Sequence, residues 1–402
     1  MALMSFVRTS CSIAAGFLSA SMAWASWSVT FLTPPNAVGV FRDLSRVEGL
    51  AMSEQAGWTS FANGAQAGVW TGVANSWRSL HPAPAIESIA TDVANGRSVG
   101  TVVTQISARA ALWNNATSEW TDLTPPGVPL AGLTSIAFLG EEGWVQGGVV
   151  RVGADIRASL WRGTPQSWVN LHPTSYVGNS FVEDVSDTDQ VGYVEGSVQE
   201  RRASLWRNTA QSWVDLSPSG STHSEATATD GRTQVGFALI AGVTHAGTWQ
   251  GTASSWQSLH PAGASNSVAT GVAGRWQVGY ALFNGARRPA LWRSSAQSFV
   301  DLASLVPDAL DGEATDVIAT PSVLTIGGFL RTSASGFNDA VLWSFTFCPA
   351  DFNQDFQGDI FDYLDFADAF AREDPLADLN SNGGVDFFDY LSFVELFARG
   401  CP

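Results

Sequence analysis

The sequence predicts an all-β protein, a seven-bladed β-propeller, followed by a small α-helical domain. Two observations predict the propeller. First, a tryptophan occurs seven times at intervals of 43 to 51 residues. A second aromatic residue lies seven positions after each of these tryptophans except the last. Second, each interval holds four short runs of β-forming residues separated by turn residues. The recurring tryptophans are Trp70, Trp113, Trp161, Trp206, Trp249, Trp292 and Trp343.

The propeller should extend from residue 26 to residue 346, with its first and last repeats incomplete. Six full units lie between Trp70 and Trp343, and the last unit lacks the strand that carries the second aromatic residue. Residues 26–32 (SWSVTFL) match that missing strand. Pairing them with the last unit would close the ring and cover both sheet edges. We therefore expect seven blades, although six or eight also fit the spacing.

The residues before the first repeat have the organisation of a secretory signal peptide. Arg8 supplies the positive end, residues 12–22 form a short apolar core, and Ala23-Trp24-Ala25 fits a cleavage site. We predict cleavage after residue 25, with a membrane anchor as the alternative. Cleavage would remove Cys11 and leave Cys348 and Cys401, whose positions around the C-terminal segment predict one disulfide in an oxidising compartment.

Composition and charge exclude several classes of function. The chain contains no lysine and has a formal net charge of −17, which argues against nucleic acid as a partner. No run of eighteen apolar residues follows the N-terminal segment, so no membrane span is expected in the mature chain. The common serine-hydrolase, zinc-peptidase and phosphate-loop motifs are also missing.

The repeats resemble the HAF-type extracellular repeats of bacteria. Residues 109–113 (RAALW) and 277–280 (QVGY) match two of the family's strands, whereas a Leu-His-Pro turn, as at residues 171–173, replaces its Leu-Gly turn. The resemblance spans roughly residues 27–345 and implies a secreted repeat domain without an assigned activity. We expect the tryptophans to pack between blades, with carbohydrate stacking as the alternative.

Three aspartates occupy matching positions near the end of the predicted innermost strand: Asp92, Asp184 and Asp316. Innermost strands surround the axis, so these carboxylates could ring the mouth of a central channel and serve a hydrolase or a cation. Aspartates also cap turns, and no histidine or other base accompanies these three, so catalysis is the less favoured interpretation. The histidines of the Leu-His-Pro turns are expected to be turn residues.

Residues 347–402 form a separate acidic segment with two calcium-loop patterns, 27 residues apart. Oxygen ligands at positions 1, 3, 5 and 12, a carbonyl at position 7 and a water-linked acid at position 9 would wrap the chain around calcium. The predicted ligands are Asp351, Asn353, Asp355, Asp359 and Asp362 in the first loop and Asp378, Asn380, Asn382, Gly384, Asp386 and Asp389 in the second. Aromatic residues at helical spacing follow each loop, so each loop should lead into a helix.

The paired loop-helix pattern resembles a dockerin, of the short type bounded by Cys-Pro and Gly-Cys. The first loop departs from the family pattern, with Phe356 at position 6 and Gly358 at position 8, so calcium should bind there more weakly. The resemblance implies docking onto a cohesin-like receptor or another cell-surface component, often in polysaccharide handling. The bound ion should be coupled to folding of this short segment.

Together these patterns predict a secreted, non-catalytic binding or display propeller, anchored extracellularly or at a cell surface through a calcium-dependent tail, with polysaccharide as a candidate ligand. The alternative is a glycan-active enzyme, a glycoside hydrolase or lyase, with its site on the propeller axis. A purely structural surface protein is a third interpretation.

Overall fold

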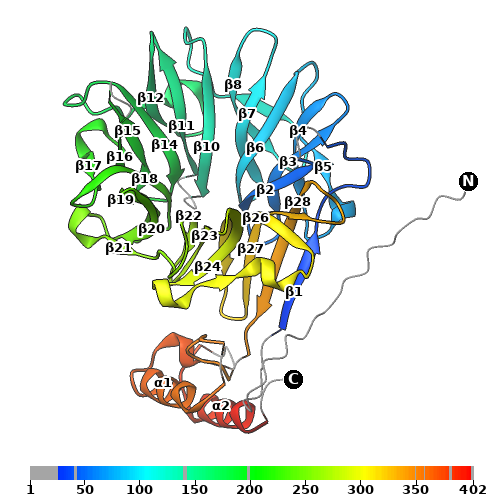
Figure 1. The fold of residues 1–402 in the computed structure, drawn as a ribbon, viewed down its shortest axis with the longest axis vertical. Coiled ribbons are helices and arrows are strands. Elements are labelled where there is room, and N and C mark those ends of the chain that lie inside the picture. Colours follow the sequence, from blue (N-terminus) through cyan, green and yellow to red (C-terminus); the bar gives the residue numbers. More distant parts are fainter. Residues whose placement is uncertain are drawn as a thin grey trace, which may run out of the picture. The chain divides into compact units, whose positions relative to one another are not determined.

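The computed structural model describes residues 26–39, 43–138, 143–196, 200–348, 350–356, 358–379 and 383–399. Seven four-stranded antiparallel sheets form the blades of a β-propeller, and two helices follow (Figure 1). The predicted fold class is therefore confirmed. Contacts divide the chain into two compact units, one of Thr30–Ile318 with Ile326–Leu342, the other containing Ala319–Thr325 and the segment from Trp343 onward.

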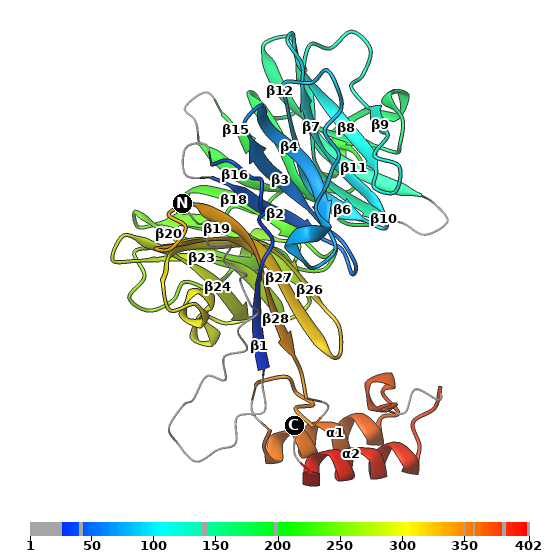
Figure 2. The ribbon, with the colours of Figure 1, turned by 90° about the vertical axis from the view of Figure 1, so that its right-hand side faces the viewer.

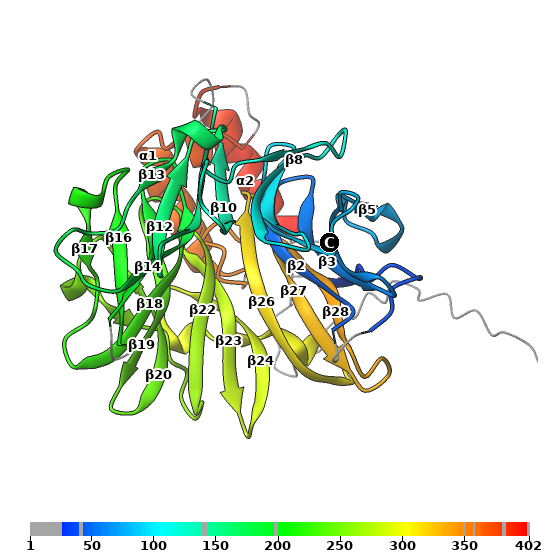
Figure 3. The ribbon, with the colours of Figure 1, turned by 90° about the horizontal axis from the view of Figure 1, so that it is seen from above.

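Each blade begins with its innermost strand, and Figure 3 shows successive sheets following one another around the ring. From the axis outward, the first three blades consist of β2 (Ser45–Leu50), β3 (Gln55–Phe61), β4 (Gly64–Trp70) and β5 (Arg78–Ser79); β6 (Glu87–Ala94), β7 (Arg97–Val103), β8 (Ala108–Asn114) and β9 (Trp120–Asp122); and β10 (Ala131–Phe138), β11 (Trp144–Val152), β12 (Asp155–Trp161) and β13 (Val169–Asn170). The fourth to sixth blades consist of β14 (Asn179–Val185), β15 (Gln190–Glu195), β16 (Arg201–Trp206) and β17 (Val214–Asp215); β18 (Ser221–Thr229), β19 (Gln234–Ile240), β20 (Val243–Trp249) and β21 (Gln257–Ser258); and β22 (Asn266–Ala273), β23 (Trp276–Phe283), β24 (Ala286–Arg293) and β25 (Val300–Asp301). The seventh blade consists of β26 (Ala309–Ala319), β27 (Val323–Thr332), β28 (Asn338–Thr346) and β1 (Ser26–Phe31).

The seventh blade combines both ends of the propeller sequence. The first strand, β1, pairs with β28 and forms the outer edge of the sheet β1-β28-β27-β26. The predicted closure by the N-terminal strand is therefore confirmed. The mechanism is pairing of two strand edges that would otherwise be exposed.

The recurring tryptophans form the core between blades. All seven lie on the third strand of a blade and are fully buried. The second aromatic residue packs on the first, as in the pairs Trp70–Trp77 and Trp249–Trp256, whose ring centroids are 4.5 Å apart. Burial of one such indole stabilises the fold by about 2–3 kcal/mol. The prediction that these indoles pack between blades is confirmed.

A glycine in the second strand of each blade permits a bulge in the innermost strand. In the fourth blade the register between β14 and β15 shifts between Val182 and Asp184, so Glu183 is the extra residue. A Cβ atom on the facing Gly192 would lie 2.0 Å from the carbonyl oxygen of Phe181, which only glycine can accommodate. The repeated Val-Gly motif therefore exists because the backbones approach closely beside the bulge.

The C-terminal segment contains α1 (Ile360–Ala371) and α2 (Phe387–Arg399), which lie side by side (Figure 2). Their shared core includes Phe366 and Phe393, which are fully buried and stacked with centroids 4.1 Å apart. The two predicted helices are thus present. In the described part of the chain no helix has the length and apolar character needed to cross a membrane.

Candidate functional site

Two adjacent positions on the innermost strands define the candidate site. We call the extra residue of each bulge the bulge position and the residue after it the mouth position. The bulge positions are Glu48, Thr91, Thr134, Glu183, Thr227 and Thr270, and Thr315 is the matching position of the seventh blade because it makes the same contact with the next blade as the other threonines. The mouth positions are Gly49, Asp92, Ser135, Asp184, Ala228, Gly271 and Asp316.

Each aspartate at a mouth position has a small residue at the mouth position of the preceding blade. A Cβ atom on Gly49 would lie 2.6 Å from Asp92, and one on Gly271 would lie 3.0 Å from the Cα atom of Asp316. Space for Asp92 and Asp316 is therefore provided by a glycine on the preceding blade.

Each of the three predicted aspartates joins its blade to the next. One oxygen of Asp184 accepts the N–H of Val185, and the other accepts the N–H of Thr229 on the following blade, both at 2.7 Å. Asp92 and Asp316 make the equivalent pairs of backbone hydrogen bonds, Asp316 with Leu50 of the first blade at 2.7 Å. The three aspartates therefore have a structural role, as links between blades, in addition to lining the axis.

Asp92 and Asp184 also share the hydroxyl group of Ser135. The Ser135 Oγ lies 2.8 Å from Asp92 Oδ2 and 2.5 Å from Asp184 Oδ1. A hydroxyl carries one hydrogen, so it can donate to only one of the two carboxyl groups at a time. Burial, together with the charges of Asp316 and Asp184, raises the pKa of Asp92 well above its ordinary value, and burial raises the pKa of Asp184 to about 6. Both aspartates therefore hold a proton more readily than an exposed aspartate does.

Threonine at the bulge position also joins neighbouring blades. The Thr227 hydroxyl donates to the carbonyl of Ala269, and the Thr315 hydroxyl donates to that of Val47, at 2.7 and 2.8 Å. Thr91, Thr134 and Thr270 make the same contact. This hydrogen bond between neighbouring blades therefore accounts for threonine at five of the seven bulge positions.

Glu48 and Glu183 are the two exceptions to this threonine pattern. Trp58 Nε1 donates to Glu48 at 3.0 Å, while no hydrogen bond to Glu183 is recorded within the described residues. Burial raises the pKa of each glutamate to about 7, and for Glu183 the nearby charge of Glu225 adds to this effect. Neither residue was predicted from the sequence, although aligning the blades on the aspartates places both one position earlier, where other units carry threonine.

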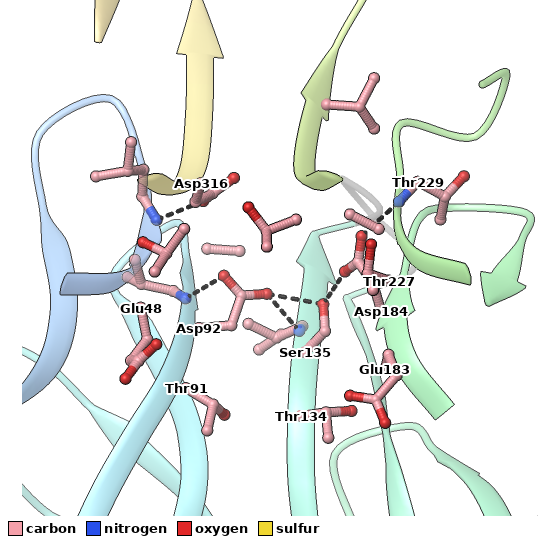
Figure 4. A pocket seen from close by; sticks show the side chains of 18 of the residues that line it. Glu48, Thr91, Asp92, Thr134, Ser135, Glu183, Asp184, Thr227, Thr229 and Asp316 are labelled. Atoms are coloured by element: carbon pink, nitrogen blue, oxygen red, sulfur yellow. Dashed lines mark hydrogen bonds between the residues drawn. The ribbon is translucent and has the colours of Figure 1, made fainter. Parts of the chain in front are cut away.

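The acids line one cavity of about 340 Å³ (Figure 4). Asp92, Asp184 and Asp316 lie together with Glu48 and Glu183, and hydroxyl groups of threonine and Ser135 complete most of the polar wall. The volume is at the lower end of the range for small-molecule sites. The structure thus places the three sequence-predicted aspartates around one cavity and adds two glutamates to it.

The turn histidines have a structural role. In His172, Nδ1 lies 2.9 Å from Ser180 Oγ and Nε2 lies 3.1 Å from the carbonyl oxygen of Tyr176, and Ser180 in turn accepts the N–H of Ala158. His81 and His260 repeat these contacts. Because the ring donates through Nε2 and accepts through Nδ1, it is neutral, and burial lowers the pKa of His172 in agreement.

The first predicted calcium loop brings its two end residues into one buried network. Asp351 and Asp362 are 5% and 0% exposed. Asp351 accepts the N–H groups of Asp355 and Phe356, and Asp362 accepts those of Asn353 and Asp359. Burial and the charge of Asp362 raise the pKa of Asp351 to about 7. Adjacent buried carboxyl groups fit a loop that a hard cation would complete.

At position 9 of each loop the acid caps a helix. Asp359 accepts the N–H of Phe361, and Asp386 accepts that of Phe388, so both carboxylates stabilise helix N-termini. Asp389 is fully buried, and Asp378 accepts the N–H of Gly383. Gly384, at position 7, lies within the described part of the second loop.

Several predicted features lie outside the described residues. These are Asn380 and Asn382, the signal peptide of residues 1–25, and Cys401. Cys348 is disulfide-bonded. Among the described residues, no group of three or more His, Cys, Asp or Glu side chains converges in a way that could hold a metal ion.

Comparison with known proteins supports the fold alone. No protein-family model matches the chain, and no curated protein sequence does. Among solved structures, a puromycin-hydrolyzing peptidase of Mycobacterium tuberculosis is similar, with 12% identity, a TM-score of 0.50, and coverage of 76% of this chain and 55% of the peptidase. An oligogalacturonate lyase in complex with manganese has 12% identity, a TM-score of 0.49 and coverage of 83% and 97%. The β-propeller domain of the Trilobed protease from Pyrococcus furiosus has 8% identity, a TM-score of 0.48 and coverage of 76% and 94%.

These solved structures include a peptidase, a lyase and the propeller domain of a protease. This chain spans about half the length of the peptidase. At such low identity the similarity does not transfer an activity to this chain.

Proposed function

We propose that the propeller is an extracellular binding module whose axial cavity holds a polar, polyhydroxylated ligand such as a segment of polysaccharide. The observation that carries this proposal is the replacement of threonine by Glu48 and Glu183 at two bulge positions. The threonines hold the ring together, so glutamates that give up this contact provide groups for a ligand. The surrounding hydroxyl and carboxyl groups suit hydrogen bonds with sugar hydroxyl groups.

A non-catalytic role is the leading interpretation because the aspartates are held in place by the fold. Each accepts two backbone N–H groups, one from its own blade and one from the next. A carboxylate that moves to attack a substrate or exchange its proton would break a contact between blades. The cavity therefore supports recognition better than chemistry.

The second candidate is a glycan-active enzyme, and one observation favours it. Asp92 and Asp184 both lie within hydrogen-bond distance of Ser135, and burial raises the pKa of each carboxyl group. Glycoside hydrolases use a pair of carboxyl groups in different roles, one as the acid and the other as the base or nucleophile. In that case Asp92 would be the acid and Asp184 the base or nucleophile.

The C-terminal segment is proposed to be a calcium-dependent docking module. Three pairs of apolar residues, 27 positions apart, are exposed on its two helices, including Phe361 at 60% and Phe388 at 66% exposure. The other pairs are Ile360 with Phe387 and Leu364 with Leu391. Apolar side chains repeated in this way suit a receptor with an apolar docking face, such as a cohesin-like domain or a cell-surface component. Secretion, as the N-terminal residues predict, would place both modules outside the cell.

One experiment separates binding from catalysis in the propeller. The full chain is applied to a glycan array, and every bound glycan is then incubated with it while release of reducing ends and of unsaturated products is measured. Binding without product supports the module. Product that disappears in both D92N and D184N supports the enzyme, and absence of both binding and product contradicts both. The matched control is Glu87→Gln, which changes an exposed glutamate on β6.

A second experiment tests the docking module. F361S combined with F388S should abolish capture of a surface-displayed receptor from the same cells, while circular dichroism shows unchanged helix content. Loss of capture on adding a chelator should match this result. Capture that persists in the double variant, or without calcium, would refute docking through these side chains.

A further inference from the structure

The cavity has an unusual distribution of charge. Five carboxyl groups line it, and no arginine, lysine or histidine is among its described lining residues. The other polar groups of its wall are hydroxyl groups of threonine and Ser135, which can donate or accept hydrogen bonds. A ligand that enters therefore meets negative or neutral acids without a balancing cation.

The nearest cations are already engaged elsewhere. Arg201 faces Glu183, but it donates to Glu195 at 2.9 Å and to Glu225 at 2.7 Å. The remaining charged or titratable groups around Glu183 are Glu225, Asp184 and Tyr193. Glu183 is thus partly buried in the cavity wall beside two other acids.

Glu48 has a similar environment on the first blade. Arg46 is the cation beside it, and this arginine donates to Asp43 at 3.1 Å and lies over the ring of Phe329. The other charged groups around Glu48 are Glu313 and Asp43. Removing a carboxylate from water is costly unless an opposite charge compensates, and here each arginine is shared between a glutamate of the cavity and the acids with which it forms ion pairs.

We propose that the axial cavity selects a ligand bearing an aliphatic ammonium group, with Glu48 and Glu183 among the carboxyl groups that attract it. An ammonium group offers three donors and one positive charge, so it can donate to a carboxylate of the cavity wall and relieve the repulsion among the acids. This inference rests on the proposed function of the cavity and specifies its ligand.

The ammonium group has two chemical sources, a de-N-acetylated amino sugar or a polyamine. The pKa values of Glu48, Glu183 and Asp316 near 7 agree with either source, because the cavity gains negative charge as the pH rises through 7. Binding of a cation should become tighter over the same interval. Linkage requires the bound cation to lower those pKa values in turn.

The test is calorimetric titration of the full chain with three probes: a glucosamine trimer, an N-acetylglucosamine trimer and putrescine. We expect the glucosamine trimer, putrescine or both to bind at least tenfold more tightly than the acetylated trimer. The probe that binds identifies the source. Putrescine remains doubly charged from pH 5.5 to 8, so a tenfold increase in its affinity over that range would report titration of the cavity alone.

Two variants and one control complete the experiment. Glu183→Gln and Glu48→Gln should each weaken binding about tenfold and reduce its pH dependence, whereas Glu87→Gln should leave both unchanged. Thermal unfolding of each variant checks that it is folded. Equal binding of the acetylated trimer would overturn the ammonium inference while leaving the proposed glycan site in place. Absence of binding by all three probes overturns the ammonium inference, and the glycan array then decides whether the proposed function also fails.

Discussion

Replacing Glu183 by glutamine should stabilise the propeller at alkaline pH and leave its stability in acid unchanged. Burial and Glu225 raise the pKa of Glu183 from 4.5 to about 7 in the folded protein. A raised pKa means that the folded state keeps its proton longer than the unfolded state. The folded state is therefore fully stabilised below pH 4.5, and this stability is lost as the pH rises through 7. Glutamine has nearly the same shape and stays neutral.

The expected magnitude follows from the size of the shift. One pKa unit corresponds to about 1.4 kcal/mol, so at pH 8 the variant should be more stable than the wild type by about 3 kcal/mol. For a propeller of this size, that difference raises the melting temperature by roughly 5 °C. At pH 4.5 the two proteins should melt within about 1 °C of each other, because the glutamate is protonated in the fold.

The assay is thermal unfolding followed by tryptophan fluorescence at pH 4.5, 6 and 8. Every tryptophan precedes residue 344, so the signal reports mainly the propeller; among the described ring contacts, Trp27 with Phe356 links a tryptophan to the C-terminal segment. Glu87→Gln, at an exposed position, should stay within about 0.5 kcal/mol of the wild type at each pH. A Glu183→Gln variant that is less stable than the wild type at pH 8, or equally stabilised at every pH, would refute the reasoning. A variant that gains stability and loses ligand binding would identify Glu183 as a residue retained for function.

Three further predictions concern the fold. Ser135→Ala should cost about 1–3 kcal/mol, because Asp92 and Asp184 lose the hydroxyl group between them; chemical denaturation measures this, and a neutral result would contradict a stabilising role of the shared hydroxyl group. Trp70→Phe should cost about 1 kcal/mol more than Trp206→Phe, because the Trp70 N–H donates to a backbone carbonyl at 2.8 Å whereas that of Trp206 has no partner among the described residues; equal costs by the same measurement would argue against this hydrogen bond. A calcium chelator should reduce helical circular dichroism without changing the tryptophan-detected melting of the propeller, and unchanged helicity would count against the predicted calcium loops.

The blade count and the closure of the ring could be predicted from sequence because both depend on local, repeated patterns. The spacing of the tryptophans marks one blade at a time, and the strand at residues 26–32 matches the element missing from the last unit. The glycine of the Val-Gly motif was apparent in the sequence as well. The reason for this glycine was not apparent, because the carbonyl group that excludes a side chain there belongs to the neighbouring strand.

The candidate site was only half predictable. Matching positions in the repeats identified Asp92, Asp184 and Asp316, and the structure places all three around one cavity. Glu48 and Glu183 were missed because their importance depends on the contact that threonine makes at the same position with the next blade. A comparison of that column across the repeats would have shown the two exceptions, although not their position on the axis.

By itself, the amino-acid sequence determined the β-rich architecture, the number of repeats and the two helices of the acidic tail, because turn chemistry, strand length and apolar periodicity act over a few neighbouring residues. Only the tertiary structure decided which acids share the hydroxyl group of Ser135 and which remain for a ligand. Ser135 is 43 residues from Asp92 and 49 from Asp184, and the three meet because the closed ring brings consecutive innermost strands together at the axis. Burial at the axis then raises the pKa of both aspartates.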